Sequence, residues 1–279
     1  MHRLRVTVAA GSIAALAVAA LPQSQQPDRQ YDWPRPKYEV RIEPDAMVAM
    51  RDGVKLATDL YFPVQLQGKL AVILIRTPYD KGRYRTAGHA VPRVLAGQGY
   101  IVAVQDTRGR FASEGQYVIQ GNDSSDGYDV VDWLAKQPWS NGNIGTIGCS
   151  YEGDVQIIQS KLRHPNLKCM IPQSAGSSIG SADNRYYFFG ARKGGNVEVA
   201  SGLGWFANNG NKDRTKPAAN LPEDRFRRFW STLPLAGMVQ RAGGPPSDWD
   251  DVASRELTDP WWDQGVHPVP GRGCSGADT

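Results

Sequence analysis

The sequence predicts an α/β protein, in which a sheet of mostly parallel strands carries helices on its faces. Continuous apolar runs such as Leu70–Ile75 are typical of parallel strands that are buried on both faces. They alternate with amphipathic stretches such as Asp123–Lys136, at the spacing of strand–helix–strand units with right-handed crossovers. Ligands of such sheets bind beyond the carboxyl ends of the strands, so we expect the reactive residues at that edge.

The first 20 residues differ in composition from the rest of the chain. A basic start, MHRLR, is followed by an uncharged apolar run and by the small-residue pattern Ala17–Ala19. This arrangement predicts a cleaved secretory signal peptide at 1–20. The apolar run is short for a membrane span, although an uncleaved anchor is the alternative. We therefore expect a secreted or periplasmic protein without membrane contact after cleavage. Residues 21–37 are expected to form a disordered leader between the signal peptide and the folded core.

The predicted core of the sheet covers residues 38–175. Its first part, Tyr38–Val64, alternates apolar and polar residues around a turn at Arg51-Asp52-Gly53, which indicates an antiparallel hairpin. We expect buried strands at 70–75 and 100–104, and apolar strands at 144–147 and 167–172. Helices are expected at 89–97, at 123–136 and after Ser150.

The strand pattern fades after Ala175. Residues 176–262 are rich in aromatic residues, glycine and arginine, and we interpret them as a mostly helical cap over the carboxyl edge of the sheet. Residues 263–279 show no periodicity and offer nothing to bury, so we expect an unstructured tail.

Charge and cysteine content exclude several classes of protein. The net charge is only +4, and no cluster of lysine and arginine is present, so a nucleic-acid partner is not expected. The three cysteines, Cys149, Cys169 and Cys274, form neither a disulfide framework nor a metal-binding spacing. We expect Cys149 and Cys169 to be buried as small apolar residues. No metal and no other cofactor are expected.

The segment Gly148–Gly153, GCSYEG, directly follows the apolar strand at 144–147. A strand, a glycine-flanked serine and an amphipathic segment are typical of a nucleophile elbow, with Ser150 at the turn. Such a turn strains the backbone and leaves no space for side chains beside it, which explains the glycines. The Gly-x-Ser-x-x-Gly spacing is one residue longer than the common form. A plain strand-to-helix turn is therefore the alternative for this hexapeptide alone.

Two further loops follow buried strands and are predicted at the same edge as Ser150. They are RTPYDKGR at 76–83 and QDTRGRFASEG at 105–115. Together with the elbow they resemble the CocE/NonD (S15-type) serine hydrolases, which include X-Pro dipeptidyl peptidases, cocaine esterases and α-amino-acid ester hydrolases. The resemblance extends from Ala46 to Gly190. It implies the N-terminal part of an α/β-hydrolase sheet with a mostly helical cap.

The resemblance implies hydrolysis of ester or amide bonds through an acyl-enzyme on Ser150. The oxyanion would be bound by the backbone N–H of Tyr151 and by the hydroxyl of Tyr79, for which a packing role is the alternative. Asp183 is a candidate for binding a substrate ammonium group, and a helix cap is its other interpretation. The expected partners are a small-molecule ester, an amide or a short peptide. Oligomers are possible in this family.

Asp106 and Arg108, in the second loop, are interpreted as a structural brace beneath the elbow. An aspartate beside an arginine at a strand end commonly fixes loops through charge-assisted hydrogen bonds. We expect no direct part in the chemistry for either residue.

A serine nucleophile also needs a histidine base and an orienting carboxylate. In the family these lie in a Gly-Trp-Tyr-Asp-like strand end and a Gly-Pro-Trp-x-His-like loop, and neither motif follows Ser150. Only His267, preceded by Asp259 or Asp263, has the required order, but its context matches no family motif. His164 is expected at the surface near the end of a helix.

We therefore expect a chain that stops early, by truncation or frameshift, without the later strands and the C-terminal β-sandwich of the family. The first hypothesis about function is an exported serine hydrolase that is incomplete without its base. The second is a non-catalytic remnant or binding protein that keeps the cleft. The third, an unrelated secreted binding module with an accidental serine turn, is disfavoured by three motifs in register.

Overall fold

The computed structural model describes residues 34–86, 90–175, 179–182, 185–188, 192–193, 196–212, 224, 227, 233–256, 259 and 261. The predicted signal peptide, most of the predicted leader, the tail and the candidate residues Asp183, Asp263 and His267 lie outside these ranges. None of the described helices is long and apolar enough to cross a membrane.

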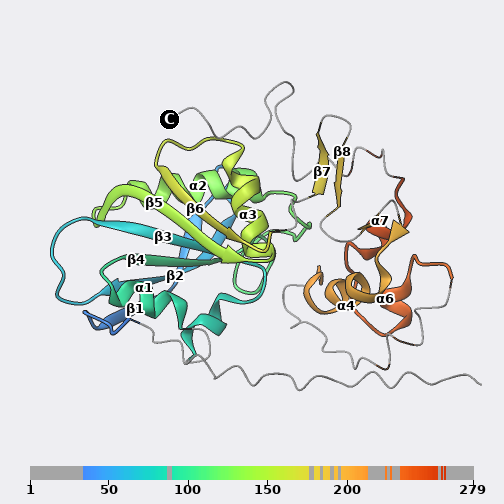
Figure 1. The fold of residues 1–279 in the computed structure, drawn as a ribbon, viewed down its shortest axis with the longest axis horizontal. Coiled ribbons are helices and arrows are strands. Elements are labelled where there is room, and N and C mark those ends of the chain that lie inside the picture. The colour runs from blue at the N-terminus through green and yellow to red at the C-terminus, as the bar shows by residue number, and fades with distance from the viewer. Residues whose placement is uncertain are drawn as a thin grey trace, which may run out of the picture. The chain divides into compact units, whose positions relative to one another are not determined.

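A six-stranded sheet in the order β1-β2-β4-β3-β5-β6 forms the core (Figure 1). The strands are β1 (Val40–Ala49), β2 (Lys55–Pro63), β3 (Leu70–Thr77), β4 (Ile101–Asp106), β5 (Ser140–Cys149) and β6 (Leu167–Gln173). β1 and β2 form the predicted antiparallel hairpin, and β2 pairs antiparallel with β4. The remaining pairs are parallel. The predicted mixed α/β architecture is confirmed.

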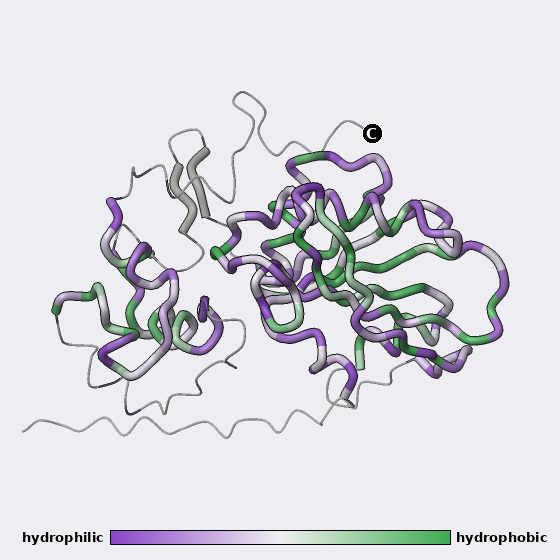
Figure 2. Tube along the Cα trace, turned by 180° about the vertical axis from the view of Figure 1, so that it is seen from behind, coloured by the Kyte–Doolittle hydropathy of each residue, from purple (hydrophilic) through white to green (hydrophobic). Residues whose placement is uncertain are grey.

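Helices cover the two faces of this sheet. α1 (Val91–Gly97) contributes Ala96 to an apolar cluster on one face, together with side chains of β2, β3 and β4. α2 (Asp123–Ala135) packs its buried apolar residues against the other face, and α3 (Tyr151–Ser160) lies beside it. Figure 2 shows that hydrophobic segments run along the central strands. These strands carry apolar residues continuously because helices bury both faces of the sheet.

The strand β6 departs from the prediction. Cys169 in this apolar strand was expected to be buried, but the residues from Lys168 to Gln173 are exposed, including the free thiol of Cys169. Cys149, at the end of β5, is also exposed, so the predicted burial of both cysteines is wrong. The physical reason for β6 is its place at the edge of the described sheet, where no described strand pairs with its outer side.

The described part of the predicted cap contains strands as well as helices. Two short hairpins, β7 (Ile179–Ala182) with β8 (Arg185–Phe188) and β9 (Arg192–Lys193) with β10 (Asn196–Val197), were not predicted. They are followed by the helices α4 (Val199–Asn209), α6 (Met238–Arg241) and α7 (Trp249–Ser254). The three helices share an apolar core, which also includes Tyr117, Tyr151 and Val155. The helices of the cap therefore pack directly on the segment that follows Ser150.

Buried polar contacts also join the cap to the loop after β4. Arg110 Nη1 donates to the carbonyl oxygen of Asn211 at 2.8 Å. The Ile119 N–H donates to Asp248 Oδ2 at 2.9 Å, and Lys212 forms an ion pair with the other oxygen of Asp248. Burial raises the pKa of Asp248, and the hydrogen bond from Lys212 opposes that shift. Because buried polar groups need such partners, these contacts specify how the cap meets the core.

Arg76 and Asp123 form a buried ion pair that joins β3 to the start of α2. The Nη2–Oδ1 distance is 3.0 Å, and the two side chains are 1% and 6% exposed. Arg76 Nη1 also donates to the carbonyl oxygen of Asp123 at 2.9 Å. Burial raises the pKa of Asp123, whereas the charge of Arg76 favours its ionised form.

We expect Arg76→Met to lower the free energy of unfolding by about 3–5 kcal/mol, because it leaves a buried carboxylate without its partner. Urea denaturation measures this loss. Arg51→Met is the control, since it breaks the ion pair between Arg51 and Asp129, in which the arginine is 54% exposed. Exposed pairs contribute roughly 0–1 kcal/mol. Equal losses in the two variants would contradict the prediction.

Candidate active site

Ser150 lies at a sharp turn between β5 and α3. Its backbone has φ 62° and ψ −126°, which is unusual for a residue other than glycine. Such conformations cost on the order of 1–3 kcal/mol and are concentrated at functional sites. The Ser150 N–H donates to the carbonyl oxygen of Gln173 at 3.0 Å, and the residue is exposed. The predicted strand, turn and helix are therefore present, with the serine displayed at the end of the sheet.

The two glycines of the motif are required by close packing. A Cβ atom on Gly148 would lie 2.4 Å from the Cβ of Glu152, and one on Gly153 would lie 2.7 Å from the carbonyl oxygen of Gln173. Both distances are shorter than real contacts. The glycines thus let α3 begin directly against the ends of β5 and β6, which is what displays Ser150.

The side chain of Tyr151, the first residue of α3, fixes the start of this helix. Its side chain is fully buried, and its hydroxyl donates to Asp123 Oδ2 at 3.0 Å and accepts from the Gln120 N–H at 2.8 Å. Burial raises the pKa of Tyr151 well above its usual value, so the hydroxyl stays protonated. The first N–H groups of a helix have no acceptor within the helix and carry partial positive charge. The backbone N–H of Tyr151 is therefore suited to bind an oxyanion.

Tyr79 lies in the loop of residues 78–80, between β3 and the short helix η1 (Lys81–Arg85). Its ring meets that of Tyr151 edge-on, with 6.5 Å between centroids. Trp205 of α4 donates its indole N–H to the Tyr79 hydroxyl at 3.4 Å and stacks on Tyr151 at 6.0 Å. The Tyr79 hydroxyl accepts this bond through oxygen, so its own proton can be donated to a ligand. The structure thus brings Ser150, Tyr151 and Tyr79 to one edge.

Buried charges anchor the loop that carries Tyr79. Lys81 is 3% exposed and pairs with Asp45 and, at 3.2 Å, with Asp59. The Lys81 N–H donates to Asp106 Oδ1 at 2.7 Å. Arg108 bridges Asp52 in the β1–β2 turn and Asp126 in α2. Asp106 thus fixes the Tyr79 loop, and Arg108 joins the β1–β2 turn to α2, as expected of residues that fix loops. The predicted place of this brace beneath the elbow stays a prediction.

The described residues supply no base for Ser150. His164 is the one histidine among them, and its Nδ1 accepts from the Asn166 N–H at 3.1 Å while its ring packs on Tyr128. It is only 6% exposed, so its predicted surface position is wrong: the segment after α3 folds back onto α2. Asp259, the described candidate for an orienting carboxylate, is paired with Arg255 of the cap.

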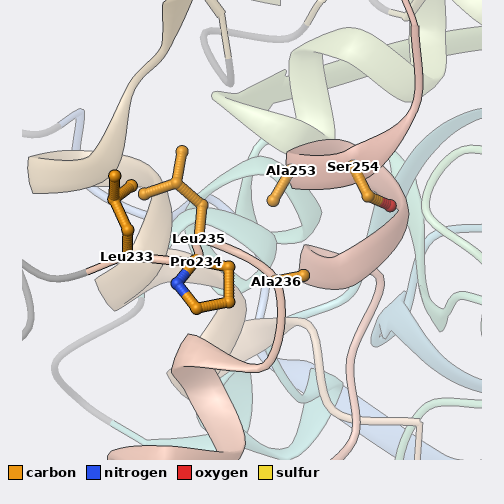
Figure 3. A pocket seen from close by; sticks show the side chains of 6 residues that line it. All are labelled: Leu233, Pro234, Leu235, Ala236, Ala253 and Ser254. Carbon is orange, nitrogen blue, oxygen red and sulfur yellow. The ribbon is translucent and has the colours of Figure 1, made fainter.

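A hollow of about 550 Å³ lies on the cap (Figure 3). It is lined by Leu233, Pro234, Leu235, Ala236, Ala253 and Ser254. None of these residues belongs to the elbow or to the Tyr79 loop, and only one side chain is polar. A ligand site usually needs several converging polar groups, so we assign no part in the chemistry to this hollow.

The sequence pattern did not indicate three residues whose contacts lie around the site. Trp205 donates to the Tyr79 hydroxyl, Arg110 donates to the Pro78 carbonyl oxygen at 3.0 Å, and Glu152 accepts from the Tyr84 hydroxyl at 2.7 Å. Trp205 was one of many aromatic residues in the predicted cap, Arg110 was one letter of the second loop, and Glu152 was one letter of the elbow motif. Their contacts join segments that are far apart in the chain. No local pattern indicates such contacts.

A mostly parallel sheet that displays a serine at a strained turn between a strand and a helix defines an α/β hydrolase. Comparison with known families makes this more specific. Residues 52–268 match the family described as X-Pro dipeptidyl-peptidase (S15 family). The chain belongs to this family.

Relatives of the chain are named esterases and hydrolases. It is 37% identical over 185 residues to a cocaine esterase from Rhodococcus sp. (strain MB1 Bresler), a match that covers 66% of this chain and 31% of the relative. The solved structure of an aminopeptidase from a marine sediment archaeon, Thaumarchaeota archaeon, has a TM-score of 0.61 and 25% identity, over 88% of this chain and 43% of that one. A CocE/NonD family hydrolase from Staphylococcus aureus shares the fold, with a TM-score of 0.52 and 22% identity, over 82% of this chain and 41% of that chain. The chain thus spans about a third of the curated relative's length.

The Asp106 side chain gives the stability a predictable pH dependence. Burial raises its pKa to about 7, and no described group binds its Oδ2 atom. Its pKa in the unfolded chain is near the model-peptide value of about 3.9. Between these values the folded protein keeps a proton that the unfolded chain has released, so the contribution of Asp106 to stability falls as pH rises from 4 to 7.

We expect Asp106→Asn to remove this contribution, since the amide oxygen can still accept from the Lys81 N–H. The variant should gain stability relative to the wild type as pH rises from 4 to 7, by at most about 4 kcal/mol. Urea denaturation at several pH values measures the difference. Asp52→Asn is the control, because Arg108 lowers the pKa of Asp52. Loss of this carboxylate should destabilise the protein above pH 4. A constant difference between Asp106→Asn and wild type would contradict the prediction.

Proposed function

We propose that the chain carries the nucleophile and the oxyanion-binding residues of a serine hydrolase that cleaves acyl ester or amide bonds. The observation that carries the proposal is the strained, exposed Ser150 between β5 and α3, with the Tyr151 N–H and the Tyr79 hydroxyl at the same edge. The family of the chain and the names of its relatives support the same class of reaction.

In the proposed mechanism, Ser150 Oγ attacks the carbonyl carbon of the substrate and transfers its proton to a histidine base. The negative charge on the carbonyl oxygen is stabilised by the Tyr151 N–H and the Tyr79 hydroxyl. Collapse of the tetrahedral intermediate expels an alcohol or an amine, which takes up that proton. Water then attacks the acyl-enzyme and releases the acid. His164, the one described histidine, packs on Tyr128 of α2, so we place the proposed base outside the described residues.

The substrate class is proposed from the relatives. One is named a cocaine esterase and another an aminopeptidase, so we propose a small ester, an amide or a short peptide as substrate. Asp183 is proposed to bind the ammonium group of such a substrate. We also propose that residues 1–20 direct export of the protein, and that residues 38–175 and 176–262 are its hydrolase core and cap.

A second candidate function is binding without catalysis. It is favoured by the position of His164, the one described histidine, which packs against α2 and not beside Ser150. The two functions differ in the reactivity of Ser150. Catalysis needs an activated serine, whereas binding does not.

We expect a fluorophosphonate probe to label the wild-type protein, and we expect Ser150→Ala to abolish the labelling. Covalent capture requires an activated hydroxyl at the elbow, so gel fluorescence or intact mass measures it directly. Ser160→Ala, at the end of α3, is the control and should be labelled like the wild type. An unlabelled wild type would favour the binding protein, and labelling of Ser150→Ala would place the nucleophile elsewhere.

We expect Tyr79→Phe to lower the kcat for p-nitrophenyl acetate by about 10²–10³, because one oxyanion donor is lost. The KM should change little, since the donor acts mainly on the transition state. Tyr100→Phe, which removes an equivalent hydroxyl from a residue that is 42% exposed, is the control. An unchanged kcat in Tyr79→Phe would leave this tyrosine with a packing role alone.

A further inference from the structure

Glu152 is a buried acid within the elbow motif itself. It is the second residue of α3 and is only 8% exposed. The nearby charge of Arg83 favours its ionised form. Burial raises its pKa, and hydrogen bonds from Thr77, Tyr84 and the backbone of Cys149 oppose that rise. Burying a carboxyl group is costly unless hydrogen bonds compensate it, so these partners account for its presence.

The partners of Glu152 come from both sides of Tyr79. The Tyr84 hydroxyl donates to Glu152 Oε1 at 2.7 Å. The Thr77 hydroxyl accepts the Tyr79 N–H at 3.1 Å, and it lies close enough to the Glu152 carboxyl group to lower the pKa of that group as a hydrogen-bonding neighbour. A hydrogen-bonded chain therefore runs from the Tyr79 backbone through Thr77 to Glu152 and on to Tyr84.

The positions of these residues along the polypeptide show which segments the hydrogen bonds join. Thr77 is the last residue of β3, and Tyr84 lies in η1, so they flank the loop 78–80 on its two sides. Glu152 directly follows Tyr151 in α3. The Glu152 carboxyl group thus has hydrogen-bonding partners on both flanks of the loop that carries Tyr79, one proposed oxyanion donor. Its backbone is joined directly to Tyr151, whose N–H is the other proposed donor.

We propose that Glu152 is a positioning residue, which holds the Tyr79 loop against the nucleophile elbow so that the Tyr79 hydroxyl and the Tyr151 N–H face one oxyanion. The inference rests on the proposed function, because it assumes these two donors. Oxyanion donors act at about 2.7–3.1 Å, and a displacement of about 1 Å costs on the order of 10² in rate. Glu152, in α3, supplies the contact that fixes how far the Tyr79 hydroxyl lies from the oxyanion.

A second anchor lets this proposal be tested in folded protein. Lys81 fixes the other side of the loop through Asp45, Asp59 and Asp106. These contacts do not involve Glu152. Loss of the Glu152 hydrogen bonds should therefore loosen the loop locally, without unfolding the sheet.

The test uses two variants that keep the shape of the side chain. Glu152→Gln replaces one accepting oxygen by an amide that cannot accept, so one of the two hydroxyl bonds is lost. Tyr84→Phe removes one donor and leaves the ring. We expect each to slow fluorophosphonate labelling of Ser150 by roughly tenfold. The double variant should be slowed by much less than the product of the two effects, since the residues act through one contact.

Hydrogen exchange provides the second readout. We expect faster amide exchange in Glu152→Gln and Tyr84→Phe at residues 79–85, with α3 and β5 unchanged. A general loss of stability would instead raise exchange in all three segments and would overturn the proposal. Glu39→Gln and Tyr100→Phe, at exposed positions, are the matched controls and should resemble the wild type in both measurements.

The two readouts separate failure of this inference from failure of the proposed function. A wild type that the probe does not label would overturn the role of Ser150. Exchange at 79–85 would then still show whether Glu152 holds the loop, and unchanged exchange in both variants would overturn the inference. Slower labelling with unchanged exchange would overturn it too, because Glu152 would then act by another route than positioning.

Discussion

The backbone at Ser150 is held at a positive φ, and that conformation depends on tight packing around the start of α3. Gly148 and Gly153 allow the helix to approach the strand ends, and the buried Tyr151 hydroxyl is bound by Asp123 and by the loop after β4. A strain of about 1–3 kcal/mol persists only where the surroundings determine the conformation in this way. The result is a serine displayed at the carboxyl edge of the sheet.

Buried carboxyl groups with specific partners organise the edge around that serine. Asp123 joins Arg76 to Tyr151, and Glu152 joins Thr77 to Tyr84. Burial of either carboxyl group without partners would destabilise the fold, and the hydrogen bonds and the ion pair compensate that cost. The cap adds Trp205, whose indole touches the Tyr79 hydroxyl and stacks on Tyr151. The geometry of the site is therefore shared between the sheet, its loops and the cap.

The errors of prediction have a common physical origin. An apolar run such as 167–172 predicts a strand, but it does not show whether a neighbour covers that strand, and β6 is exposed together with Cys169. His164 follows a helix and looks like a surface residue, but the chain folds back so that it packs on Tyr128. Burial depends on contacts between segments that are distant in sequence, and a local pattern contains no information on them.

The sequence by itself determined the order of strands and helices in the core, the position of the elbow and the two loops beside it, because hydrophobic periodicity and glycine placement act over short distances. Only the tertiary structure decided which side chains from those loops meet. The link from Tyr79 through Thr77 to Glu152, and the contact with Trp205, arise from the pairing of β3 with β5 and from the packing of α4 on α3. Such contacts follow from the assembled sheet and cap, and a one-dimensional pattern cannot encode their geometry.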